Sequence, residues 1–123
     1  MIENKKSKGI NNKRKIALVG FILLSTFIFL YKYNVKTFYF GVIEVKDLKQ
    51  VNNDYIVTVE GDFGEKKSVF DQDDYFRIVE DEETREGNIT EIWNRLSENK
   101  SFHVVLNSYD NRNQFILEKI YID

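Results

Sequence analysis

The feature that most constrains the fold of this chain is an uncharged, almost wholly apolar run from Ile16 to Tyr31. As a helix, these sixteen residues would span about 24 Å, somewhat less than the roughly 30 Å of a bilayer core. Lys15 and Lys32 flank the run and can extend their ammonium groups outward, and Tyr31 and Tyr33 suit the headgroup layer. The run therefore predicts a membrane anchor over residues 16–33, which meets lipid through Ile16 to Tyr31.

Two other interpretations of this run stay open. A buried core helix needs elements around it, and the rest of the chain offers none long enough to enclose a helix that is apolar on all sides. A cleaved signal peptide shares the basic start, but its apolar part is about 7–15 residues long and is followed by small residues at cleavage spacing. Ala17 is the chain's one alanine and lies at the wrong end of the run. An uncleaved anchor is favoured.

Charge divides the chain into two parts. Residues 1–37 hold eight Lys and Arg against Glu3, whereas residues 38–123 hold ten basic and nineteen acidic side chains, a net charge of −9. Six basic residues precede the apolar run, and Lys32 and Lys36 closely follow it. The positive-inside rule then leaves the N-terminus in the cytoplasm and exports the acidic part. The Asn-, Lys- and Ile-rich composition is typical of an AT-rich bacterial genome, so we expect a single-pass protein of a bacterial cell membrane.

This division predicts four segments. Residues 1–15 form a basic cytoplasmic tail without regular structure, residues 16–33 the anchor, residues 34–37 a short linker, and residues 38–123 an exported acidic domain. The net negative charge of that domain repels phosphate, so no nucleic-acid partner is expected. The chain has no cysteine and a single histidine, which excludes disulfides, thiol nucleophiles and multi-histidine metal sites.

The sequence pattern of the acidic domain predicts five strands and one helix. Alternating or apolar segments place strands at residues 37–45, 55–60, 66–70 continuing in 75–79, 102–106 and 114–122. Gly41 suits a bulge or bend in the first strand. The order of elements predicts an OB-fold-like five-stranded barrel with one helix, with an SH3-like barrel or an open α+β sheet as alternatives.

The predicted helix carries one apolar stripe. Ile89, Ile92, Trp93 and Leu96 fall at the spacing of one helix face, and Trp93 is expected to fill the barrel core. Asn88 precedes the stripe, and the residue at the third helical position is glutamate, as in a capping box.

Acidic residues are concentrated between residues 71 and 86. Oxygen-rich clusters bind calcium outside cells, so Asp71, Asp73 and Asp74 are candidate metal ligands. The EF-hand pattern breaks at Tyr75 and Phe76, and a solvated loop before the helix is favoured instead. The remaining acids are candidates for a partner-binding surface: Glu80, Asp81, Glu82, Glu83 and Glu86.

Neither a catalytic residue nor a cofactor is expected. His103 lies in the middle of a predicted strand, the serines stand in no nucleophile motif, and no phosphate-binding glycine loop is present in the sequence. The sequence therefore favours a membrane-anchored binding module that recognises a protein or envelope partner near the membrane, because the short linker keeps the domain there. The alternatives are a small envelope enzyme or cation-dependent factor that uses the 71–86 loop, and an immunity or accessory protein for a membrane-acting toxin.

Overall fold

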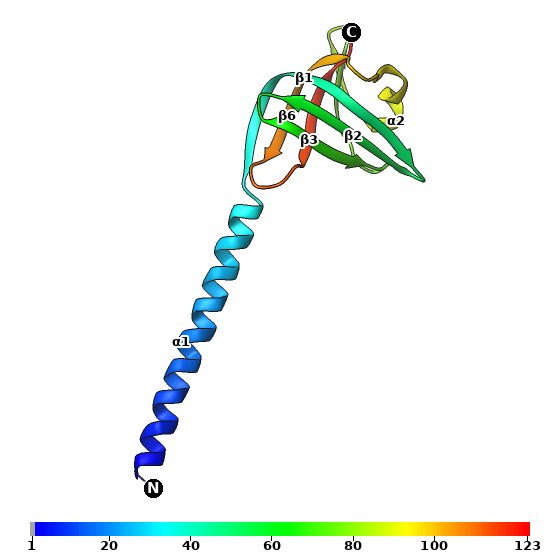
Figure 1. The fold of residues 1–123 in the computed structure, drawn as a ribbon. Helices are drawn as coiled ribbons and strands as arrows, with labels where there is room; N and C mark the ends of the chain where they lie inside the picture. The colour runs from blue at the N-terminus through cyan, green and yellow to red at the C-terminus, as the bar shows by residue number, and fades with distance from the viewer. Residues whose placement is uncertain (1) are drawn as a thin grey trace. The chain divides into compact units, whose positions relative to one another are not determined.

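The computed structural model describes the backbone of residues 2–123 and the side chains of residues 12–123. The chain divides into two compact units that meet between Asn34 and Val35. The first unit is helix α1, Ile2–Tyr33, and the second is a sheet domain with one short helical segment (Figure 1).

Helix α1 is long and apolar enough to cross a membrane. Its segment Asn12–Tyr33 has 22 residues and a mean hydropathy of 1.9, and none of that window is buried. The helix of a protein core would be buried, so the exposure of this segment argues against the core-helix interpretation. The prediction that residues 1–15 lack regular structure is wrong, because α1 begins at Ile2. Extending an existing helix needs no new nucleus, and Lys and Arg are good helix formers, so the basic segment continues the apolar one.

The second unit is a seven-stranded sheet. Its elements are β1 (Lys36–Val51), β2 (Asp54–Gly61), β3 (Gly64–Phe70), β4 (Phe76–Glu80), β5 (Glu83–Gly87), α2 (Ile89–Ile92), the 3₁₀ helix η1 (Trp93–Arg95), β6 (Ser101–Tyr109) and β7 (Phe115–Tyr121). The strands lie in the order β3-β2-β1-β6-β7-β4-β5, and β4 with β7 is the parallel pair. The sheet is open, so the expected closed five-stranded barrel is wrong in strand number and in closure.

The expected and observed strand numbers differ because of the segment between residues 70 and 87. The expected split third strand is two strands that lie apart, because β3 pairs with β2 whereas β4 pairs with β7 and β5. The expected solvated loop is a hairpin: Asp81 and Glu82 have φ of 54° and 67° and form its turn. Strand β5, of sequence ETREG, is almost wholly exposed at the sheet edge. An exposed edge strand needs no apolar alternation, so the sequence pattern gave no signal for it.

Strand β1 is the longest and pairs with two neighbours. Residues 36–44 pair with β6 and residues 44–51 with β2, and the register with β2 shifts between Val45 and Asp47. Gly41 lies five residues before this bulge. A Cβ at Gly41 would lie 2.8 Å from the hydroxyl of Tyr39, which donates a hydrogen bond to the Val42 carbonyl at 2.9 Å. The glycine therefore makes room for the tyrosine ring.

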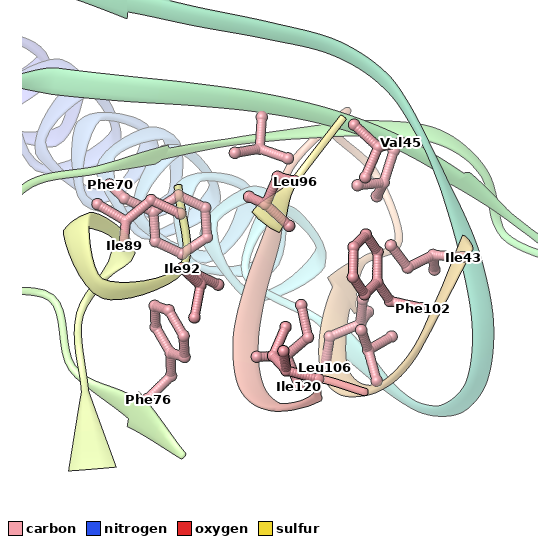
Figure 2. Close-up of a cluster of buried hydrophobic side chains, with 14 of the residues drawn as sticks. Ile43, Val45, Phe70, Phe76, Ile89, Ile92, Leu96, Phe102, Leu106 and Ile120 are labelled. Atoms are coloured by element: carbon pink, nitrogen blue, oxygen red, sulfur yellow. The ribbon is translucent and has the colours of Figure 1, made fainter. Parts of the chain in front are cut away.

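The core lies between the sheet and the short helical segment. Figure 2 shows that Ile89, Ile92 and Leu96 lie among buried side chains of the strands, which include Ile43, Phe70, Phe76, Phe102, Leu106 and Ile120. The predicted capping box is confirmed: Asn88 accepts from the Thr90 N–H, and the Glu91 carboxylate accepts from the Asn88 N–H.

Trp93 lies at the margin of this core. Its ring is half-buried and meets the ring of Tyr55 edge to face, with centroids 4.9 Å apart. The prediction that Trp93 fills the centre of the core is therefore wrong. Isoleucines of α2 occupy that place instead, because the α-helix ends at Ile92 and the chain tightens into η1.

Candidate functional site

A groove between β3 and β7 leaves room for a ligand at the surface of the sheet domain. Across residues 2–123, these strands meet at one isolated parallel bridge, Lys67–Gln114, beside which the Lys67 N–H donates to the Asn113 carbonyl at 3.0 Å. Two neighbouring hollows, of about 300 Å³ and about 220 Å³, are both lined by Ser68, Val69 and Ile116. They therefore form one continuous depression, which we call the β3–β7 groove.

Backbone edges of both strands face this groove. In an antiparallel pair, every second residue directs its N–H and C=O away from the partner strand. The Lys67 N–H points toward the β6–β7 turn, so Val69, two residues on, also directs its backbone groups away from β2. On the other wall, the Gln114 carbonyl accepts from Tyr109 of β6, so Phe115 and Leu117 direct theirs away from β6. Beyond the bridge, the edge of β3 at Val69 and the edge of β7 at Leu117 thus face one space.

The side chains of the groove combine apolar walls with charged ends. Val69 is 54% exposed and Ile116 is 38% exposed, so both offer apolar surface. The larger hollow is bounded by Asp73 and Asp74, and the smaller one by Lys67. An occupant of the groove would therefore meet negative charge at one end and positive charge at the other.

A buried lysine fixes the Lys67 end of the groove. Lys66 is 8% exposed, and its ammonium group donates to the Tyr109 carbonyl at 2.7 Å and to the Arg112 carbonyl at 2.9 Å. The Arg112 guanidinium in turn lies 3.6 Å from the centroid of the Tyr109 ring. Strand β3 is thus tied to the β6–β7 turn through charge-assisted hydrogen bonds, which are stronger than neutral ones.

The proposed metal ligands Asp71, Asp73 and Asp74 form a tight turn beside the groove. The Asp71 N–H donates to Oδ2 of Asp74 at 2.9 Å, and the Asp73 N–H donates to Oδ1 of Asp71 at 2.7 Å. Within the described part of the chain, no group of three His, Asp or Glu side chains is arranged to hold a metal ion. The geometry gives the carboxylates of Asp71 and Asp74 a turn-forming role.

Glu80, one of the proposed partner-surface residues, is held by two arginines of its own domain. Its carboxylate pairs with Arg85 at 3.3 Å and accepts a hydrogen bond from Arg95. The Arg95 hydrogen bond, assisted by Arg85, holds the pKa of the Glu80 carboxyl below its ordinary value. These contacts join the β4–β5 hairpin to η1.

The other proposed partner-surface acids lie on the same hairpin. Asp81 and Glu82 form its turn, Glu83 lies opposite Glu80, and Glu86 lies opposite Arg77. All four are exposed. The structure spreads them along the hairpin rather than gathering them, and their role in partner binding stays a prediction.

Sequence reasoning missed the groove itself. Val69 and Ile116 lie 47 positions apart, and their proximity depends on the curvature of the sheet. His103 is exposed on β6, opposite Val42 of β1, and contributes to neither hollow of the groove.

Comparison with known protein families, with curated proteins and with solved structures finds no match to this chain.

We expect Lys66→Met to destabilise the domain by about 1–3 kcal/mol, because it leaves two carbonyls without their buried donor. Urea unfolding followed by circular dichroism measures this change. Lys67→Met is the matched control, since Lys67 is exposed and its backbone bridge stays intact, and we expect less than about 0.5 kcal/mol there. Equal effects of the two substitutions would show that the Lys66 hydrogen bonds do not stabilise the groove end.

We expect Glu80→Gln to lower thermal stability at neutral pH and to leave stability at low pH nearly unchanged. The folded-state pKa of Glu80 lies below its ordinary value of 4.5. Its contribution is therefore present above that value and is lost as the pH falls through the folded-state pKa. Melting temperatures between neutral and acidic pH measure the difference, with Glu83→Gln as control. A difference that does not shrink on acidification would contradict this role of the ion pairs.

Proposed function

We propose that this protein is a membrane-anchored binding module that holds an extended segment of a protein partner in the β3–β7 groove. The observation that carries this proposal is the pair of strand edges that face the groove beyond the Lys67–Gln114 bridge. An extended peptide that enters such a space completes the sheet by strand addition. Main-chain hydrogen bonds then supply affinity, and alternate side chains supply specificity.

The groove also indicates what kind of segment it would take. A bound strand presents every second side chain to Val69 and Ile116, which favours small or apolar residues at those positions. The carboxylates of Asp73 and Asp74 favour a basic residue at that end. The module is proposed to act by binding, without a catalytic step.

The arrangement of strands supports an OB-like description of the domain. A meander of β1, β2 and β3 is followed by a short helix and then by β6 and β7, and the Lys67–Gln114 bridge brings β3 to the start of β7. On this view, β4 and β5 are an added hairpin, inserted before the helix, whose strand β4 pairs with the C-terminal half of β7 on the edge away from β6.

We further propose that α1 spans a bacterial cell membrane, with its N-terminus in the cytoplasm and the sheet domain outside. The basic residues before the apolar segment outnumber those that closely follow it, and cytoplasmic segments carry such an excess. Because Asn34 and Val35 alone separate α1 from β1, the domain stays close to the membrane. A partner in or on the same membrane then meets the groove at raised effective concentration.

We expect a photo-crosslinking amino acid at Ile116 to capture the partner in intact cells, and Val69→Pro to reduce this capture about tenfold. Proline removes the N–H that Val69 directs into the groove, and a lost hydrogen bond of about 1.4 kcal/mol is a factor of ten. The N–H does not serve the β2 pairing, so the fold should persist, which circular dichroism checks.

The matched substitution is Val69→Thr, which keeps the N–H and the branched shape and should leave capture nearly intact. A crosslinker at Val51 is the positional control for the one at Ile116, because Val51 is an exposed apolar residue that lines neither hollow of the groove; the two are 52% and 38% exposed. If proline and threonine act alike, or if position 51 captures the same partner, strand addition in the groove is the wrong mechanism.

For the orientation, we expect protease added to cells stripped of their wall to digest residues 35–123 and to spare an epitope placed before α1. Immunoblots of the membrane fraction measure both segments, with permeabilised cells as the control for protease access. A protected sheet domain would reverse the orientation, and a soluble form that lacks the helix would show cleavage as a signal peptide.

A further inference from the structure

The first half of β1 carries an exposed apolar row. Phe38, Phe40 and Val42 alternate along the strand and are 65%, 63% and 45% exposed. Val105 of β6 lies opposite Phe40 in the register and is 8% exposed. These four residues make one apolar strip on the outer side of β1 and β6, which we call the outer apolar face. It is distinct from the core, to which the next residue, Ile43, belongs and against which the intervening residue Tyr39 packs.

The charges around this strip differ from those of the rest of the domain. Residues 35–123 contain 11 Lys and Arg and 19 Asp and Glu, a net charge of −8. Beside the outer apolar face, Lys36 precedes Phe38 on the same side of β1, and Lys119 lies opposite Val105 in the register of β6 with β7. Two acids also lie near the strip. Glu118 accepts a hydrogen bond from Asn107. Glu44 follows Val42 on the same side of β1, where it pairs with Lys46 at 3.4 Å. Lys36 and Lys119 thus place cations beside the strip on an acidic domain.

Chain length limits how far this strip can lie from the end of α1. Tyr33 ends the helix, and five residues lead to Phe38, which spans at most about 18 Å. Seven residues lead to Phe40, or at most about 25 Å. If α1 crosses the membrane, both phenylalanines stay within reach of the lipid headgroups.

We propose that the outer apolar face lies on an anionic lipid surface, with Phe38 and Phe40 in the headgroup layer and Lys36 and Lys119 against lipid phosphates. Peripheral membrane-binding surfaces combine a narrow apolar strip with Lys or Arg beside it, and anionic headgroups attract those cations. An exposed apolar strip of this kind on a domain of net negative charge marks an interaction surface. The inference rests on the anchoring of α1 proposed above, and it leaves the β3–β7 groove open to a partner.

The test uses the full chain in phosphatidylcholine vesicles that contain phosphatidylglycerol. The chain has no cysteine, so a spin label can be placed at one introduced cysteine at a time. Val42→Cys reports on the outer apolar face, and Val51→Cys is the matched control, since both valines lie on β1 and are 45% and 52% exposed. Nine residues of strand separate them by at most about 30 Å. Phe40→Cys is a second reporter on the face.

We expect the labels at positions 42 and 40 to collide severalfold more often with lipid-soluble oxygen, relative to a water-soluble nickel chelate, than the label at position 51. Replacing Phe38 and Phe40 by serine should return the position 42 label to the value at position 51. Omitting phosphatidylglycerol should move it in the same direction. Circular dichroism shows whether each variant is folded.

The remaining outcomes are decisive against the proposal. If the labels at both 42 and 40 collide with oxygen no more often, relative to the nickel chelate, than the label at 51, the proposal is overturned. If these collision ratios are equal with and without phosphatidylglycerol, the preference for anionic lipid is overturned. Spin–spin broadening at position 42 that disappears on dilution with unlabelled chain would show that a second copy covers the face instead.

A label at Leu24 separates this inference from the anchoring of α1. If Leu24→Cys reports water, α1 is not inserted and the anchor proposal fails. If it reports lipid while the labels at 42 and 40 report water, the face proposal alone fails.

Discussion

The sheet domain depends on the pairing of β1 with two different strands. Its first half is hydrogen-bonded to β6 and its second half to β2, so it is the one strand that joins the β1–β2–β3 meander to the β6–β7 hairpin. The register shift after Val45 bends the strand between these halves, as bulges do. Strands β2 and β6 lie on opposite edges of β1. The bend of β1 curves the sheet, so their outer neighbours β3 and β7 approach one another. The Lys67–Gln114 bridge and the Lys66 hydrogen bonds are where they meet.

The local elements could be predicted where a periodic pattern reports burial. The second strand and β6 have apolar residues at alternate positions, β7 begins with the apolar run of residues 115–117, and Asn88 with Glu91 marks the helix start. Strand β5 could not be predicted, because its exposed polar residues follow no period. The pairing of β4 with β7 was also out of reach, since it joins residues 77–79 to residues 119–121. The groove could not be predicted for a similar reason. Its walls are parts of β3 and β7 that are distant in sequence, and no periodic pattern reports which strand edges face each other.

The acidic residues show why proximity in sequence is a poor guide to a site. Between residues 71 and 86 they suggested one cluster, but that segment holds the turn at residues 71–74 and then the β4–β5 hairpin, which reverses direction at Asp81 and Glu82. Asp71 and Asp74 serve a turn, and Glu80 pairs with arginines on β5 and η1. Each of these carboxylates thus satisfies backbone N–H groups or cations nearby. Because these carboxylates are engaged by their own neighbours, they do not gather into a cation site among residues 12–123.

The groove and the outer apolar face place different physical demands on the same domain. Strand addition relies on main-chain hydrogen bonds, which contribute about 0.5–1.5 kcal/mol each, so a short segment bound in the groove would be held weakly. The proposed confinement to one membrane would compensate, because an effective concentration of roughly millimolar allows a weak contact to be well occupied. A domain that also lies against lipid loses rotational freedom before its partner arrives, and part of the entropic cost of association is then already met. The short connection through Asn34 and Val35 and the phenylalanines of β1 therefore favour the same outcome, which is a groove presented to membrane-bound partners in a restricted set of orientations.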